Sequence, residues 1–225
     1  MRVVVVRHGS AAASEVARRL SAGDRERLAS LADDPEAVAR FLAGRQALLT
    51  AAERSGFPEV AIDATCPDCG RSHGRPRAKG EATLHLALSH AAGHAFAVAA
   101  SAPVGIDAEA LDTDPARLRE AAALLAHPVD RPRAALRAWT ATEAVLKADG
   151  RGLRVDPSAV RLGPRIAVLD GSLYRLSSRQ RAGCRVAVAR LLAASVRVGE
   201  AQAVSEGRRR SRSQASKKSV SPSPA

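Results

Sequence analysis

Two carboxylates that stand two residues apart, Asp107 and Glu109, are the first candidates for chemistry in this sequence. They belong to VGIDAEA (104–110), a run typical of a β-strand, and residues two apart on a strand leave the same face. Neighbouring acids repel each other, and a divalent cation would remove that repulsion. Ligation by oxygen alone suits Mg²⁺, particularly where a substrate phosphate completes the coordination shell. The alternative is an exposed acidic strand end without a ligand.

A second group follows in WTATEAVLKADGRGL (139–153), where Trp139, Glu143 and Lys147 are spaced by four. That spacing places all three on one face of an α-helix, which the two glycines after it would end. Glu143 would add a third carboxylate, and carboxylates with a lysine beside a metal suit phosphoryl or phosphodiester chemistry. The alternative is a Glu–Lys pair on the helix surface.

The lysine is itself informative, because the chain has only four lysines among its 35 basic residues. Arginine therefore serves wherever a positive charge is all that is needed. A compact ammonium that can hand over a proton is one reason for a lysine at position 147, since a guanidinium does not release its proton in proteins.

Further polar residues could contact phosphates. Ser89 and His90 end a predicted strand, LHLALSH, and could bind phosphate oxygens or act as a base. Adjacent positions on one strand cannot form a hydrolytic Ser–His dyad. Arg45 in AGR and Arg75 in HGRP are expected in Gly-flanked turns, which suit phosphate binding.

Cys66, Cys69 and His73 have a spacing that is plausible for zinc ligands. A structural zinc site needs a fourth ligand, and no obvious one follows in the sequence. The segment 66–80 is rich in Cys, Gly and Pro, so we expect it to be a loop.

Composition limits the class of protein. A chain of 225 residues with 46% hydrophobic content can bury one large core or two small ones. No apolar run is long enough to span a bilayer, so we expect a cytoplasmic protein without membrane association. Three cysteines argue against a disulfide framework.

The net charge of +12 is unevenly distributed. Residues 208–225 hold six basic residues and no acid, and we expect 200–225 to be a disordered basic Ser/Pro/Arg tail. The basic body that remains suggests an acidic partner, which could be nucleic acid, a polyphosphate ligand or an acidic protein. An aromatic content of 2% leaves little for base stacking and weakens the option of single-stranded nucleic acid.

The periodicity predicts an α+β fold built from two similar α/β halves, 1–103 and 104–199. In the first half a strand in MRVVVVRHGS leads through helices within 14–56, with breaks near Gly23 and Pro35, to a β-hairpin.

The second half repeats this plan, with helices from about 115 to 149 and a second hairpin. AGHAFAVA (92–99) and AGCRVAVA (182–189) agree at five of eight positions, which suggests an internal repeat. A pseudo-twofold relation between the halves, with the active site in the cleft between them, is the natural expectation.

Together these residues resemble the 4′-phosphopantetheinyl transferases of the larger, single-chain, surfactin-synthetase type. The matching segments, in order, are FLAGR, CPDCGRSHGRP, LALSHAAGHAFAVA, VGIDAE, LLAHPVD and WTATEAVLKADGRGL. The ordered pair of GIDxE and WxxxEAxxKxxGxGL is highly specific to that family, whereas each shorter element is weak. The resemblance implies two similar halves with coenzyme A in the cleft between them.

Carried over residue by residue, the resemblance implies a catalytic centre in the second half. Asp107, Glu109 and Glu143 would hold Mg²⁺ on the diphosphate of coenzyme A. Lys147 would contact the α-phosphate or protonate the leaving 3′,5′-ADP, and Glu143 would take the proton of the attacking hydroxyl, directly or through water.

The resemblance also implies residues that bind the nucleotide of coenzyme A. His90, with Ser89, would bind the adenosine phosphates. Arg45 and Arg75 would grip the nucleotide, with Arg75 at its 3′-phosphate. Asp130 in LLAHPVD departs from the family, which often has a glutamate there, and its role in carrier docking or catalysis stays open.

The activity implied is Mg²⁺-dependent transfer of the 4′-phosphopantetheine arm of coenzyme A to a serine of an apo acyl or peptidyl carrier protein. Carrier proteins are acidic, so the positive body should steer them. We expect a monomer that does not bind nucleic acid. The alternative is a zinc- and charge-dependent nucleic-acid-binding protein, suggested by CPDC and the arginine-rich tail. A metal-dependent nuclease is disfavoured, because its acid-x-lysine signature lies on a strand, whereas Glu143 and Lys147 have helical spacing.

Overall fold

Runs of helices and runs of antiparallel strands follow one another in an α+β fold, which a computed structural model describes for residues 2–10 and 13–194. The first half contains β1 (Val4–Arg7), α1 (Ala13–Arg18), α2 (Ala22–Ala29), α3 (Pro35–Glu53), β2 (Ile62–Thr65), β3 (Ser72–Ala78), β4 (His85–Ala91) and β5 (His94–Ala100). The second half contains β6 (Val104–Ala110), α4 (Pro115–Ala123), α5 (Pro132–Asp149), β7 (Arg161–Leu162), β8 (Ile166–Leu169), β9 (Ser172–Arg181) and β10 (Cys184–Ala193). Two 3₁₀ turns, η1 (Gly152–Arg154) and η2 (Pro157–Ala159), follow α5.

The strand order recurs in the two halves. One sheet has the order β1-β5-β4 and the other begins β6-β10-β9, so in both the last strand pairs with the first strand and with its hairpin partner. Both hairpins turn on an Ala-Gly pair with positive φ at both residues, at Ala92–Gly93 and at Ala182–Gly183. These dihedral signs match the two-residue turn that suits the twist of a hairpin. The expectation of an α+β fold is confirmed, and the hairpins that suggested a repeat occupy equivalent places.

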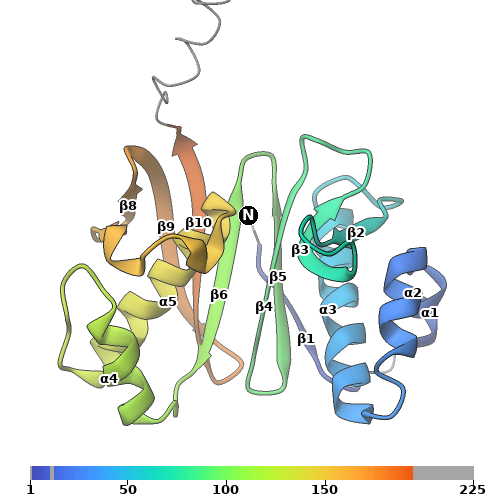
Figure 1. The fold of residues 1–225 in the computed structure, drawn as a ribbon, viewed down its shortest axis with the longest axis horizontal. Coiled ribbons are helices and arrows are strands. Elements are labelled where there is room, and N and C mark those ends of the chain that lie inside the picture. The colour runs from blue at the N-terminus through green and yellow to red at the C-terminus, as the bar shows by residue number, and fades with distance from the viewer. Residues whose placement is uncertain (1, 11–12, 195–225) are drawn as a thin grey trace, which may run out of the picture. The chain divides into compact units, whose positions relative to one another are not determined.

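The hydrophobic core lies in layers between these elements (Figure 1). One cluster fills the space between α3 and the first sheet, and another lies between α5 and the second sheet. A third cluster joins the sheets and includes Phe96 of β5, Ile106 of β6 and Val186 of β10. Strands β4 and β6, one from each half, therefore lie side by side at the centre.

The structure tests three local expectations about these elements. The break near Gly23 is confirmed, since α1 ends at Arg18 and α2 begins at Ala22, where Ser21 caps the helix by accepting a hydrogen bond from the Asp24 N–H. The segment 66–80 is not all loop, since 72–78 forms β3 and pairs with the unpredicted β2. The break at Pro35 is confirmed, because Pro35 begins α3 behind the cap Asp34.

The chain from Met1 to Ala194 forms one compact unit, so the division at 103/104 stays a prediction. The proposed tail at 200–225 lies outside the described residues. Among the described helices, none is long and apolar enough to cross a membrane.

Gly105 allows α5 to lie directly against β6. A Cβ placed on Gly105 would come within 2.0 Å of the Ala144 carbonyl oxygen and 2.4 Å of the Ala148 nitrogen. No side chain fits at those distances, so the glycine in VGIDAE sets the separation between helix and strand. The polar residues of α5 reach those of β6 because of this close approach.

We expect Gly105→Ala to destabilise the fold by about 3 kcal/mol, the upper range for overpacking, because the helix backbone must move. The measurement is urea unfolding followed by circular dichroism. Gly23→Ala is the matched control, since its Cβ would lie 3.5 Å from the nearest atom of Ser72, an ordinary contact. Equal stability of the two variants would contradict this account of the packing.

Candidate active site

The helix face predicted from the spacing of four lies against the acidic strand. Lys147 Nζ on α5 donates to Asp107 Oδ1 on β6 at 2.5 Å and to Ser89 Oγ on β4 at 3.4 Å. The Ser89 hydroxyl donates to Asp107 Oδ1 at 3.1 Å and accepts from the Ala108 N–H at 3.2 Å. One lysine thus joins a helix and strands from both halves.

The other residues of the row face the same strand. The Trp139 side chain lies near enough to the Glu109 carboxylate to lower its pKa slightly, and the Trp139 ring packs on the small core between α4 and α5. Glu143 lies between Trp139 and Lys147 on the helix, and its charge interacts with Asp107 and Glu109. The Glu–Lys surface pair is therefore not the arrangement found, because the hydrogen-bonded partner of Lys147 is Asp107.

The alternative of an exposed acidic strand end does not hold for Asp107. Its side chain is only 6% exposed, since β6 lies between β4 and β10 with α5 across it. Burial raises the pKa of Asp107, and the ammonium of Lys147 opposes that shift. Burial also raises the pKa values of Glu109 and Glu143, and the repulsion of neighbouring carboxylates adds to both shifts.

The acidic group fits a hard divalent cation by its chemistry. Asp107 Oδ2 is a buried oxygen without a hydrogen-bond partner among the described residues, which is costly unless something binds it. Two further carboxylates lie nearby, because the charge of Asp107 raises the pKa values of both Glu109 and Glu143. The three sets of ligand oxygens are not gathered within 4.8 Å in this structure, so a metal would have to draw Glu109 and Glu143 inward.

His90 points away from Ser89, toward α3 and the N-terminal strand. Its Nδ1 lies 3.3 Å from Nε2 of His8, and a Cβ on Gly44 would lie 3.0 Å from its Nε2. Burial, together with the positive charges of Arg40 and His8, lowers the pKa of His90 to about 4. A neutral imidazole among cations suits an anion-binding wall, in which charged neighbours supply the attraction.

Arg45 does not lie in a Gly-flanked turn, which corrects that expectation. It lies within α3, is buried, and donates from Nε and Nη2 to the two oxygens of Asp24 at 2.7 and 2.6 Å. Ser72 Oγ donates to the same carboxylate at 2.9 Å, so this ion pair ties α2 and β3 to α3. A contact between Arg45 and a ligand would have to use the N–H bonds of Nη1 or the second N–H of Nη2.

Arg75 also lies on a strand, β3, and not in a turn. Its Nη2 donates to the Val104 carbonyl at 3.3 Å, and its guanidinium lies against Gly150, the left-handed residue that ends α5. It lines a cavity of about 840 Å³ whose basic wall also includes Arg77, Arg151 and Arg154. Arg75 therefore lines this basic cavity and does not belong to the residues around His90.

Three residues of this region were missed from the sequence: His8, Asp24 and Arg40. His8 follows the first strand and Arg40 precedes FLAGR, and both are brought to His90 by long-range contacts. One signal was available for Asp24, because an acid three residues after a serine is typical of the first turn of a helix. Its pairing with Arg45 had no local signal.

The Cys66–Cys69–His73 trio is brought together on the β2–β3 connection, apart from the acidic group. Asp130 is exposed in the segment between α4 and α5, and no contact in the structure assigns it a role.

Residues 103–169 match the family model of the 4′-phosphopantetheinyl transferase superfamily. The matched segment contains β6 and α5, and thus Asp107, Glu109, Glu143 and Lys147 together. Arg45, Arg75, Ser89 and His90 lie outside it. No curated protein matches the chain. The match supports a transferase that acts on carrier proteins.

Proposed function

We propose that this transferase moves the 4′-phosphopantetheine arm of coenzyme A onto a serine of an apo acyl or peptidyl carrier protein, as the surfactin-synthetase-type enzymes do. The observation that carries the proposal is the junction of Lys147 and Ser89 on Asp107 Oδ1, which leaves the buried Oδ2 of the same carboxylate without a partner. A phosphate-bearing substrate with a divalent cation would satisfy that oxygen.

Asp107, Glu109 and Glu143 would hold Mg²⁺, since an all-oxygen donor set suits a hard cation. Bound Mg²⁺ would supply the positive charge that neutralises the diphosphate of coenzyme A. Lys147 and Ser89 both bond to Asp107, so this carboxylate is oriented before anything binds. Pre-orientation of this kind lowers the cost of assembling a charged site.

The chemistry needs one proton taken and one charge stabilised. The serine oxygen of the carrier attacks the β-phosphorus of coenzyme A, the bond from that phosphorus to the bridging oxygen breaks, and 3′,5′-ADP leaves. Glu143 would take the serine proton, directly or through water, because its carboxylate lies beside Asp107 and one helical turn from Lys147. Lys147 would stabilise or protonate the α-phosphate of the leaving group.

The anionic nucleotide would be held by the positive surroundings of the site. Around His90 the charges of Arg40, His8, Arg45 and Lys147 all act on the imidazole, so the potential there is positive. Arg75 lines the basic cavity of about 840 Å³, and we propose that it contacts the 3′-phosphate there.

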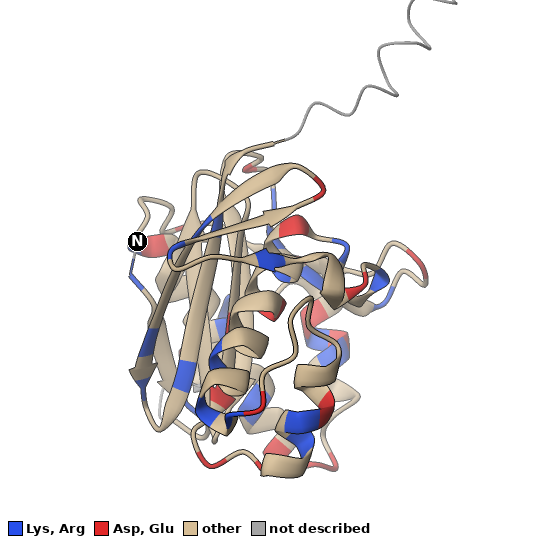
Figure 2. Cartoon of the chain, turned by 90° about the vertical axis from the view of Figure 1, so that its left-hand side faces the viewer, with Lys and Arg blue, Asp and Glu red and all other residues tan. Residues whose placement is uncertain are grey.

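The acidic carrier would dock on the basic surface of the second half. Another cavity, of about 1160 Å³ and separate from the one that contains Arg75, lies between α5 and the strands β7–β10. Apolar residues line it together with four arginines, Arg137, Arg165, Arg175 and Arg185. Figure 2, which faces this half, shows basic residues on the strands as well as on the helices. Such a surface suits a partner that presents an acidic, amphipathic helix.

The test is incubation of the full chain with coenzyme A, Mg²⁺ and a panel of apo carrier proteins, followed by intact-mass measurement. We expect one carrier in the panel to gain the mass of a single phosphopantetheine arm, and the gain to vanish with EDTA. A carrier whose acceptor serine is replaced by alanine is the control.

No mass gain on any carrier, with the chain folded and Mg²⁺ present, would contradict the proposal. The alternative, a zinc- and charge-dependent nucleic-acid-binding protein, would then be tested by electrophoretic shift of RNA with the full chain and with the chain truncated after residue 199. Loss of binding on truncation would favour it, since the truncation removes the arginine-rich segment.

A further inference from the structure

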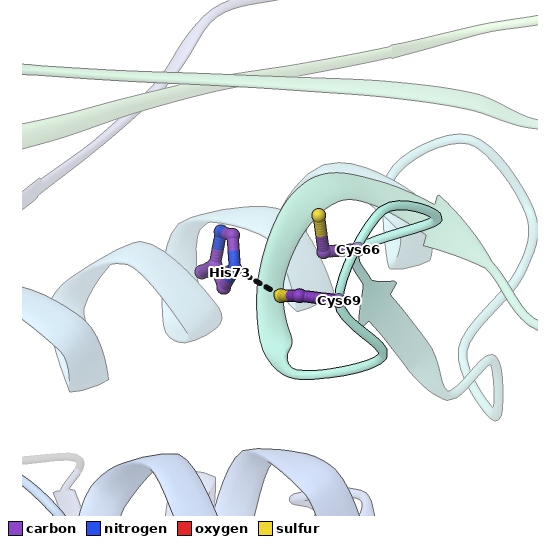
Figure 3. Close-up of side chains that lie close together, drawn as sticks. All are labelled: Cys66, Cys69 and His73. Atoms are coloured by element: carbon purple, nitrogen blue, oxygen red, sulfur yellow. Dashed lines mark hydrogen bonds between the residues drawn. The ribbon is translucent and has the colours of Figure 1, made fainter.

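Two cysteines and a histidine gather at one end of the β2–β3 hairpin (Figure 3). One potential ligand atom from each of Cys66, Cys69 and His73 lies within 4.8 Å of the other two. His73 Nε2 is 2.9 Å from Cys69 Sγ, and all three side chains belong to one short stretch of chain. In the part of the chain that the structure describes, this is the one trio of His, Cys, Asp or Glu residues gathered so closely.

The backbone of this stretch is bent so that the two thiols face the same point. Gly70 has a φ of +73°, and its N–H bonds to the Cys66 carbonyl at 2.9 Å, which closes a tight turn around the CPDC segment. The Cys66 N–H bonds to the Arg71 carbonyl at 2.8 Å. Gly74 brings the next strand against the turn, because a Cβ there would lie 2.7 Å from the Thr65 carbonyl oxygen. The ligand positions are therefore built by the backbone.

We propose that Cys66, Cys69 and His73 bind a zinc ion, with water in the fourth position. Two sulfurs and one imidazole nitrogen are a donor set that zinc prefers and Mg²⁺ does not. Around tetrahedral zinc, sulfur and nitrogen ligands stand roughly 3.6 Å apart, so Cys69 and His73 need to separate by less than 1 Å.

The fourth position is left to water because the nearest carboxylate is engaged elsewhere. Asp68 Oδ2 lies 4.0 Å from Cys66 Sγ, but it accepts from Arg154 Nη2 at 2.6 Å. Arg154 lies in η1, just beyond the end of α5, so the CPDC turn is also linked to the second half. Cys69 and His73 are exposed, so solvent reaches the open side of the site.

Zinc at this place would act on the hollow that contains Arg75. Cys66, Asp68 and His73 all line that cavity, and Arg75 stands two residues after His73 on β3. A metal that joins both ends of the CPDC–His segment would restrict the motion of β3 and thereby hold Arg75 in position. This site is separate from the acidic group, so its test does not depend on the proposed transferase activity.

The first experiment measures zinc by mass spectrometry in the full chain, purified under reducing conditions without a chelator. We expect about one zinc per chain in the wild type and at least a fivefold loss in Cys69→Ser and in His73→Ala. Cys184→Ala is the matched control, because Cys184 is the third cysteine, lies buried on β10 and should leave the zinc content unchanged.

A second measurement needs no variant. Removal of the zinc and titration of the wild-type chain with Co²⁺ should produce a thiolate-to-cobalt charge-transfer band, and Zn²⁺ should displace it. Removal should also speed amide hydrogen exchange severalfold in residues 65–77 while leaving α5 unchanged. Either equal zinc content in the wild type and Cys69→Ser, or a wild type without the cobalt band, would overturn the proposal. A Cys66–Cys69 disulfide in freshly purified, metal-free chain would also overturn it.

Discussion

Asp107→Asn is expected to reduce phosphopantetheine transfer by on the order of a thousandfold, within the range for removal of one electrostatic stabiliser from an active site. The amide keeps the size of the side chain and can still bond to Ser89 Oγ, but it loses the charge that Lys147 and a cation need. The measurement is the initial rate of carrier modification at saturating coenzyme A, with Mg²⁺ varied.

The stability of the Asp107→Asn variant should change by no more than about 1 kcal/mol, because Lys147 is one-third exposed and water can solvate its ammonium. Asp112→Asn is the matched control. It makes the same chemical change at an exposed residue just after the same strand. Near-normal turnover of Asp107→Asn in Mg²⁺ would remove Asp107 from the proposed metal site.

Lys147→Arg should lower turnover on the order of a hundredfold, which is typical of a lost general-acid contribution. The ammonium fits between Asp107 Oδ1 and Ser89 Oγ, at 2.5 and 3.4 Å, and a planar guanidinium is too wide for the same place. It also does not release its proton to a leaving phosphate. The measurement is turnover and melting temperature on the same preparation.

Lys79→Arg is the control for this substitution, because Lys79 is exposed in the turn after β3 and should tolerate arginine without loss of turnover. If Lys147→Arg kept wild-type turnover, the lysine would serve only as an ion-pair partner of Asp107. The same conclusion would follow if Lys147→Arg lowered the melting temperature strongly while each folded molecule kept the wild-type turnover.

The elements that carry the candidate active site were predicted correctly from the sequence. The spacing of Trp139, Glu143 and Lys147 predicted one helix face, and α5 presents all three toward β6. VGIDAEA (104–110) was predicted as a strand, and β6 begins and ends at these same residues. These predictions succeeded because helical and strand periodicities are local properties, fixed by backbone geometry within a few residues.

The burial of the charged residues and their pairing could not be predicted from the sequence and depend on the folded structure. Asp107 was expected to hold a metal and Arg45 to contact the nucleotide, yet each lies in the interior beside an opposite charge, Lys147 in one case and Asp24 in the other. Such partners stand 40 and 21 residues away along the chain, and no local pattern records that distance. The same limit applies to His8, which reaches His90 through the pairing of β1, β5 and β4.

Glycine shows the same division at single residues. The sequence suggested that Gly44 and Gly74 made turns, because glycine is common where the chain reverses. Instead both lie inside regular elements, where the missing Cβ leaves room for the His90 ring beside Gly44 and for the Thr65 carbonyl beside Gly74. A glycine needed for a turn and one needed for close packing are identical in sequence. The packed neighbours that distinguish them exist only in the folded chain.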